Sequence, residues 1–195
     1  MPTTHLLYLH GFRSSPLSTK ARQVAAHVAR VHPEVTWWCP QLPPSPRAAM
    51  DLVQQGIAAW PRDSMAVIGS SLGGFYATCV AQATGCRAAV LNPAVHPARD
   101  LARHIGDHAA WHDPSQRFFF APAYVDELAA LEPGPLRQPQ QVMAVIAKGD
   151  EVLDWREMVA RYPDSRILLL EGGDHALSGF EAQLPEVLAF LQLSR

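Results

Sequence analysis

The sequence predicts an α/β fold in which two layers of helices enclose a sheet of about six parallel strands. One observation behind this prediction is that short apolar segments alternate with segments of helical periodicity along most of the chain. The other is composition. The 195 residues, 48% of them hydrophobic and 17% charged, can bury one core without disulfides or a structural metal. We therefore expect a single three-layer domain over residues 1–195, with the strand order 2-1-3-4-5-6 that the usual connection rules favour.

The first half of the chain supplies two strands and two helices. Runs of apolar, β-branched and aromatic residues favour strands, whereas an apolar side chain every three or four residues before position 31 favours a helix. Ser45 and Pro46 are typical of a helix start, as an N-cap followed by proline at the first helical position. The expected elements are strands at 5–10 and 35–39 and helices at 18–31 and 46–60.

Four later strands complete the expected sheet. The apolar run 65–69 passes directly into a helical segment, and the run 87–91 is ended by Asn92 and Pro93. Two more apolar runs follow the middle of the chain, and helical periodicity returns near its end. The expected elements are strands at 65–69, 87–91, 142–147 and 167–170 and helices at 72–83 and 180–191.

Residues 93–139 interrupt the alternation. They hold several prolines and histidines, Trp111, and the aromatic run Phe118, Phe119 and Phe120. The segment is too long for a plain connection, so we expect a small cap or lid inserted over the sheet. An ordinary crossover with an irregular helix pair is the alternative. The aromatic side chains either line an acyl pocket or form the core of the cap itself.

Charge and cysteine content exclude several classes. The net charge of -2, without a long run of Lys or Arg, argues against a nucleic-acid or membrane partner. The three cysteines, Cys39, Cys79 and Cys86, lack CxxC spacing, which favours a reducing compartment. The N-terminus has no signal-peptide pattern, and no apolar run reaches the roughly 18 residues of a membrane span. We expect a soluble cytoplasmic protein with a small-molecule partner. The sequence does not determine the oligomeric state, and a monomer is compatible with it.

The strongest motif lies between the strand at 65–69 and the helix at 72–83. It reads Gly69-x-Ser71-x-Gly73. A nucleophilic serine at the end of a strand needs a sharp, strained turn, and the residues two before and two after it must be nearly free of side chain. Ser70 is the competing nucleophile, but Ile68 stands two residues before it. The alternative, a glycine-rich turn of a nucleotide-binding fold, lacks the P-loop lysine and the GxGxxG order.

A general base and an orienting acid follow in the expected chain order. His175 comes after the last strand, so it lies at the carboxyl edge of the sheet, as Ser71 does. Asp150 follows the strand at 142–147 through Gly149 and reaches the same edge. Asp154 is the second candidate for the acid, with helix N-capping as its structural alternative. Asp174 adjoins His175 in sequence and is therefore poorly placed to orient it.

The oxyanion of an acyl-transfer reaction needs two backbone N–H donors. One is expected from Leu72, directly after the nucleophile, and the other from the loop after the first strand. That loop reads His10-Gly11-Phe12, so we assign the second donor to Phe12. A simple turn after the strand is the alternative.

Several stretches together resemble the YqiA-like esterases, a family of small bacterial α/β-hydrolases. The stretches are 8–12 (YLHGF), 14–16 (SSP), 69–78 (GSSLGGFYAT), 92–95 (NPAV), 149–154 (GDEVLD) and 172–175 (GGDH). The resemblance implies an α/β-hydrolase fold with esterase activity on acyl esters. It also gives Ser71, Asp150 and His175 the triad roles. The histidine-rich middle segment departs from the family pattern and leaves the shape of the cap open.

The expected reaction is hydrolysis of carboxylic esters, preferably with short acyl chains, through an acyl-enzyme and without a cofactor. A thioesterase would use the same residues. An acyltransferase is a further alternative, as is a non-catalytic α/β-hydrolase scaffold that binds a ligand or a partner. The i, i+4, i+8 spacing of His104, His108 and His112 would place them on one helix face. Since no cysteine or carboxylate completes a closed site there, we expect a solvated face and no metal.

Overall fold

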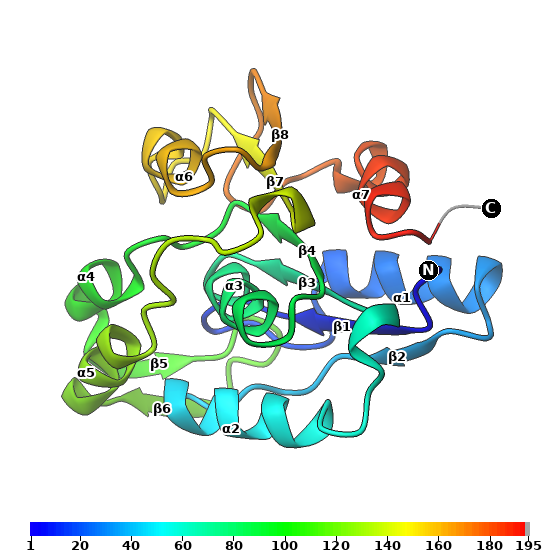
Figure 1. The fold of residues 1–195 in the computed structure, drawn as a ribbon. Coiled ribbons are helices and arrows are strands. Elements are labelled where there is room, and N and C mark those ends of the chain that lie inside the picture. The colour runs from blue at the N-terminus through cyan, green and yellow to red at the C-terminus, as the bar shows by residue number, and fades with distance from the viewer. Residues whose placement is uncertain (194–195) are drawn as a thin grey trace.

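The computed structural model describes residues 1–193, which form a six-stranded parallel sheet between helices (Figure 1). The strand order is β2-β1-β3-β4-β7-β8. Because β7 and β8 are the fifth and sixth of the predicted strands, the predicted order is confirmed. The strands are β1 (His5–Leu9), β2 (Thr36–Trp38), β3 (Met65–Ser70), β4 (Arg87–Leu91), β7 (Val142–Ala147) and β8 (Arg166–Leu170).

Helices cover both faces of this sheet. Apolar side chains of α1 and α7 pack on one face, and those of α2, α3 and α6 pack on the other. These helices are α1 (Thr19–Val31), α2 (Pro46–Gly56), α3 (Leu72–Thr84), α6 (Trp155–Arg161) and α7 (Leu184–Phe190). Short 3₁₀ turns occupy Arg62–Ser64, Ala102–His104, Pro139–Gln141 and Phe180–Ala182.

The near-continuous apolar strands are explained by burial on both sides. In β1, Leu6 and Tyr8 belong to the core beneath α1 and α7, whereas Leu7 and Leu9 belong to the core beneath α2 and α3. All four side chains are fully buried. A strand enclosed in this way has no solvent-facing side and therefore shows no polar alternation.

Two helices end differently from the prediction. The helix expected over 46–60 ends at Gly56, where a Cβ atom would lie 2.0 Å from the Trp38 ring. The helix expected over 180–191 divides into a 3₁₀ turn and α7, because Pro185 stands at the start of α7 and cannot continue a preceding helix. Ser45 caps α2 as predicted and accepts a hydrogen bond from the Ala48 N–H at 3.1 Å.

Residues 93–139 form a compact group of short elements. They are α4 (Pro97–Leu101), an antiparallel pair of strands β5 (Gly106–Ala109) and β6 (Arg117–Phe120), and α5 (Pro122–Ala130). The pair forms a small second sheet separate from the main one. The expected helical face of His104, His108 and His112 is therefore wrong. His104 ends a 3₁₀ turn, and His108 lies in β5, because β5 pairs with the aromatic strand β6 and His108 faces Phe118 in that register.

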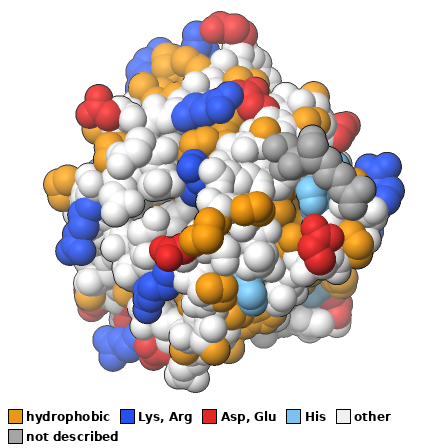
Figure 2. All heavy atoms as spheres, turned by 45° about the vertical axis from the view of Figure 1, so that its right-hand side comes forward, with side chains coloured by type: hydrophobic (Ala, Val, Ile, Leu, Met, Phe, Trp, Pro, Cys, Tyr) orange, Lys and Arg blue, Asp and Glu red, His pale blue; other side chains and the backbone are white. Residues whose placement is uncertain are grey.

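Within residues 1–193, no helix is both long enough and apolar enough to span a bilayer. On the face shown in Figure 2, acidic and basic side chains are interspersed, and neither sign gathers into a stripe. This pattern accords with the small net charge of -2.

Candidate active site

Ser71 stands on the tight turn between β3 and α3. Its backbone has φ 55° and ψ -120°, a region that non-glycine residues rarely adopt. A Cβ atom on Gly69 would lie 2.1 Å from the Gly73 carbonyl oxygen, and one on Gly73 would lie 2.0 Å from the Leu9 carbonyl oxygen. The turn therefore requires glycine at both positions, which is the physical reason for the predicted spacing.

The three residues expected to form a triad meet at the carboxyl edge of the sheet. His175 Nε2 lies 3.0 Å from Ser71 Oγ, and His175 Nδ1 lies 2.7 Å from Asp150 Oδ2. The tautomer with its proton on Nδ1 satisfies both contacts, since Nδ1–H then donates to the carboxylate and Nε2 accepts from the serine hydroxyl. The Asp150 side chain is fully buried behind the imidazole, whereas that of His175 is 21% exposed.

Backbone donors fix the Asp150 carboxylate. Its Oδ1 atom accepts the N–H groups of Val152 and Leu153, each at 2.8 Å. The second oxygen is thereby aimed at His175. The two other candidate acids are engaged elsewhere. Asp154 caps α6 by accepting from the Arg156 N–H at 2.9 Å, and Asp174 accepts from the Ser178 N–H at 2.8 Å, a contact that lowers the pKa of its carboxyl group.

Asn92 anchors the loop that carries His175, a role the sequence analysis did not assign. Its Nδ2 donates to the carbonyl oxygens of Asp174 and His175 at 2.9 and 3.2 Å, and its Oδ1 accepts from the Ala147 N–H at 2.8 Å. Asn92 is fully buried at the end of β4, with φ 40°. The sequence signal for this residue is an asparagine at the end of the strand next to the nucleophile strand, a position that by itself predicts only the end of the strand.

Two further side chains hold the same loop. The carboxylate of Glu151 accepts the His175 backbone N–H at 3.0 Å, and the Lys20 ammonium donates to the Ala176 carbonyl. Burial lowers the pKa of Lys20, and the carboxylates of Asp174 and Asp150 oppose that shift. The imidazole of His175 is thus positioned by contacts from both sides of its backbone.

The loop after β1 passes directly over the nucleophile. A Cβ atom on Gly11 would lie 3.2 Å from Ser71 Cβ, so the backbone of this loop is closely packed against the elbow. Within residues 1–193, the backbone N–H groups of Phe12 and Leu72 donate to no acceptor. Leu72 is the first residue of α3, where an N–H has no partner inside the helix. Two unpaired donors thus flank the region next to Ser71.

His10 supports this loop from within the core. It is 4% exposed, and burial lowers its pKa to about 4. Its Nε2 accepts the Leu42 N–H at 3.0 Å, so the ring is neutral and its Nδ1 donates to the Gly11 carbonyl at 3.0 Å. His10 therefore acts as a structural residue that fixes Gly11.

A cavity of about 460 Å³ opens above Ser71 and His175. This volume lies within the range of roughly 300–1,000 Å³ that small-molecule sites occupy. Its apolar wall is formed by Phe12, Leu72, Pro97, Leu101, Trp111 and Leu153.

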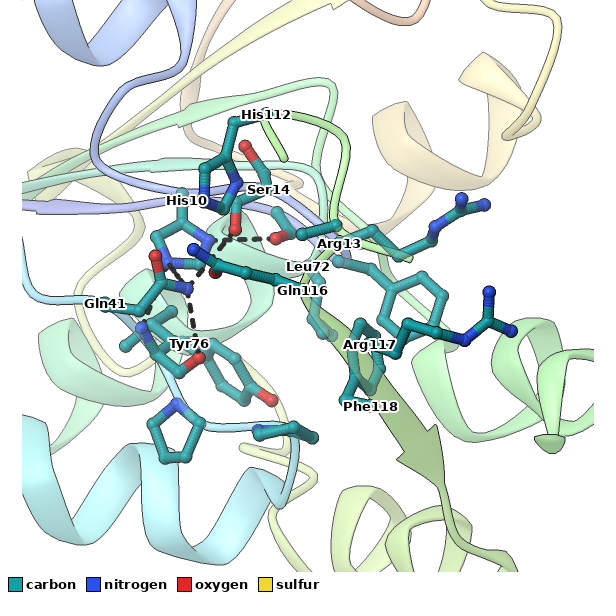
Figure 3. A pocket seen from close by; sticks show the side chains of 16 residues that line it. His10, Arg13, Ser14, Gln41, Leu72, Tyr76, His112, Gln116, Arg117 and Phe118 are labelled. Carbon is teal, nitrogen blue, oxygen red and sulfur yellow. Dashed lines mark hydrogen bonds between the residues drawn. The ribbon is translucent and has the colours of Figure 1, made fainter. Parts of the chain in front are cut away.

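A second cavity, of about 380 Å³, also borders the loop after β1 (Figure 3). His10, Gln41 and Tyr76 line it, and it shares the loop residues 11–14 and Leu72 with the first cavity. The loop that carries Phe12 thus contributes to both cavities.

The aromatic residues of segment 93–139 were expected either to line an acyl pocket or to form the core of the cap, and they do not all take the same role. Phe120 is buried, and its ring lies 5.3 Å from that of Phe12 in the core. Phe118 packs against Phe12 at 5.8 Å and lines the second cavity, whereas Trp111 lines the first. Phe119 is exposed and lines neither. Among residues 1–193, no group of three or more His, Cys, Asp or Glu side chains is arranged to hold a metal ion.

Comparisons with known proteins identify the fold and the family. The model of an uncharacterised protein family, UPF0227, matches residues 5–192. A solved structure of the metagenome-derived lipolytic enzymes LipS and LipT is 16% identical, with a TM-score of 0.72 over 100% of this chain and 96% of the other. Mouse alpha/beta hydrolase domain-containing protein 10 is 14% identical, with a TM-score of 0.71 over 97% and 91%. The monoacylglycerol lipase of Paleococcus ferrophilus is 14% identical, with a TM-score of 0.65 over 99% and 96%. At these identities the likeness shows the fold, which is that of the α/β-hydrolases.

Proposed function

The chain belongs to the protein family UPF0227, the YqiA-like family, and we propose that it is a serine hydrolase that cleaves carboxylic esters. The observation that carries the proposal is the hydrogen-bonded series from Ser71 through His175 to Asp150 at the base of a cavity. A serine hydroxyl is a weak nucleophile until a base takes its proton, and this series supplies the base and a group that orients it.

In the first step, Ser71 Oγ attacks the carbonyl carbon of the ester while His175 Nε2 accepts the hydroxyl proton. The buried Asp150 carboxylate holds the Nδ1–H tautomer and stabilises the imidazolium that forms. His175 then gives the proton to the departing alcohol, which leaves the acyl group on Ser71. In the second step His175 activates water, which attacks the acyl-enzyme and releases the acid.

The negative charge on the former carbonyl oxygen needs donors that are in place beforehand. We assign this role to the backbone N–H groups of Phe12 and Leu72. The N-terminus of α3 adds its partial positive charge at the same place. Removal of one such donor in a related mechanism costs roughly 10²- to 10³-fold in turnover.

Esters with short acyl chains are the proposed substrates, with segment 93–139 as a cap over the site. The cavity volume of about 460 Å³ and its largely apolar wall support a small acyl ester. The names of LipS and LipT as lipolytic enzymes, and of the Paleococcus ferrophilus protein as a monoacylglycerol lipase, also support an ester substrate. The chemistry requires no cofactor. Three free cysteines support action in the reducing cytoplasm.

Hydrolysis of 4-nitrophenyl esters with two to twelve carbons tests the proposal. We expect wild type to prefer the shorter chains and Ser71→Ala to lose on the order of 10⁴-fold or more in turnover. Ser70→Ala, which changes the neighbouring hydroxyl, is the matched control and should retain activity. A Ser71→Ala protein with full activity would contradict the proposal. An inactive wild type that hydrolyses thioesters of the same chain length would favour a thioesterase instead.

A further inference from the structure

Arg13 follows the proposed oxyanion-hole residue Phe12 and is held in a fixed position without a carboxylate partner. Its backbone has φ 60°, and its carbonyl accepts the Trp111 N–H at 2.8 Å. Its Nε donates to the Ala109 carbonyl at 2.9 Å. The guanidinium carbon lies 3.9 Å from the centre of the Trp111 ring, a cation–π contact. The side chain is thus ordered by a carbonyl and an aromatic ring, neither of which neutralises its charge.

The edge of the guanidinium that suits an anion remains available. Nε donates to the Ala109 carbonyl. Within residues 1–193, the two terminal nitrogen atoms of the guanidinium form no hydrogen bond and no ion pair. A guanidinium can bind a carboxylate or phosphate through two parallel N–H bonds, and the geometry is favoured when the group is already ordered. In Figure 3 the side chains of Arg13 and Arg117 extend to the same side, away from His10 and Gln41.

The charged residues around both cavities are almost all basic. Arg13 lines both cavities, Lys20 and Arg103 line the one above Ser71, and Arg117 lines the other. One acidic residue is among those that line the two cavities. It is Asp100, in the cavity above Ser71, and its carboxylate forms an ion pair with Arg99 at 2.8 Å. The chain as a whole carries a net charge of -2, so this local excess of positive charge does not follow from composition. A cleft lined by one sign of charge concentrates ligands of the opposite sign.

We propose that Arg13 is a specificity residue that binds an anionic group, a carboxylate or a phosphate, carried by the acyl group or by the leaving group of the substrate. Arg103 and Arg117 supply the surrounding positive potential. The inference rests on the proposed function, because it concerns the substrate of the same Ser71 site. It narrows that substrate from neutral acyl esters to esters or thioesters with an acidic substituent.

Two matched pairs of probes test where the anion lies. Mono-(4-nitrophenyl) adipate and 4-nitrophenyl hexanoate share the acyl length and differ in a terminal carboxylate. S-hexanoyl-4′-phosphopantetheine and S-hexanoylpantetheine share the acyl group and differ in a phosphate on the leaving group. The measured quantity is the ratio of kcat/KM for the charged probe to that for its neutral partner, so that a general change in reactivity cancels.

We expect wild type to favour the charged member of at least one pair by about tenfold, and Arg13→Gln to bring that ratio close to one. Arg13→Lys, which keeps the charge without the planar fork, should retain part of the preference. Arg103 is exposed, so Arg103→Gln should fold normally and lower the ratio about two- to threefold. Arg30→Gln, at the exposed end of α1 and outside both cavities, is the matched control and should leave the ratio unchanged.

The outcomes separate the inference from the proposed function. A preference in the adipate pair alone assigns the anion to the acyl group, and a preference in the pantetheine pair alone assigns it to the leaving group; either supports the inference. Ser71-dependent hydrolysis without a charge preference, or a preference that survives in Arg13→Gln, overturns the inference and leaves the hydrolase proposal standing. If none of the four probes is cleaved, the proposed function fails and the inference fails with it.

Discussion

At the scale of single residues, the Asp150 carboxylate divides its two oxygens between the backbone and His175. An amide in its place keeps the shape but no longer has a negative charge to hold the required His175 tautomer. We expect Asp150→Asn to lower the turnover of 4-nitrophenyl butyrate by about 10⁴-fold, with a melting temperature that shows a folded protein.

Asp154→Ala is the matched control for this variant. Asp154 caps α6, so its removal should cost about 1 kcal/mol of stability and leave turnover near the wild-type value. If Asp154→Ala were inactive while Asp150→Asn kept its activity, the orienting acid would be Asp154.

His10 makes the protein sensitive to acid through its buried, neutral ring. Its pKa is lowered from 6.5 in the unfolded chain to about 4 in the folded one, so the unfolded chain binds the proton first as the pH falls. The stability due to the neutral ring is present above pH 6.5 and is lost as the pH falls towards 4. At about 1.4 kcal/mol for each pKa unit, the loss is on the order of 3 kcal/mol.

Urea unfolding of wild type and His10→Gln at pH 7 and pH 4 measures this effect. Between the two pH values, wild type should lose about 3 kcal/mol more stability than the variant, because glutamine does not titrate. Equal losses in the two proteins would show that His10 does not titrate in this range.

At the scale of elements, the elbow between β3 and α3 depends on two glycines. Gly73→Ala would place Cβ 2.0 Å from the Leu9 carbonyl oxygen, a backbone atom that cannot move without shifting β1. We expect it to cost about 3 kcal/mol or more, and to lower Tm by roughly 6–12 °C in a chain of this size. Gly172→Ala is the control, because nothing lies within 4 Å of the added atom. Thermal unfolding of both proteins measures the difference, and equal Tm values would contradict the steric account.

The elements that sequence patterns could predict were those with a strong local signal. The six strands were recognised because burial on both faces makes them continuously apolar, and the elbow because its geometry demands Gly69 and Gly73. Helix α6 was not predicted, since Met158 is its one buried residue and its periodicity is correspondingly weak. The β5–β6 pair was also missed. Its four-residue strands are held partly by Arg13, a tertiary contact with no local signature.

At the scale of the whole molecule, the strand order brings the candidate site together. Asp150 follows β7 and His175 follows β8, which are neighbours in the sheet, whereas Ser71 follows β3 on the far side of β4. Asn92 ends β4 and bonds to both the β7 end and the His175 loop, so it spans the gap between the two sides. Chain order alone indicated Ser71, Asp150 and His175, but the role of Asn92 depends on which strand lies between them, which local patterns do not encode.

The claim that Ser71 attacks the substrate is tested most directly by trapping the covalent adduct. Wild type, Ser70→Ala and Ser71→Ala would each be treated with an alkyl fluorophosphonate, which phosphonylates activated serines, and then analysed by intact-protein mass spectrometry and peptide fragmentation. We expect wild type and Ser70→Ala to gain one adduct each, on Ser71, and Ser71→Ala to gain none. An adduct of equal yield on Ser71→Ala, or one mapped to another residue in wild type, would contradict the assignment of Ser71 as the nucleophile.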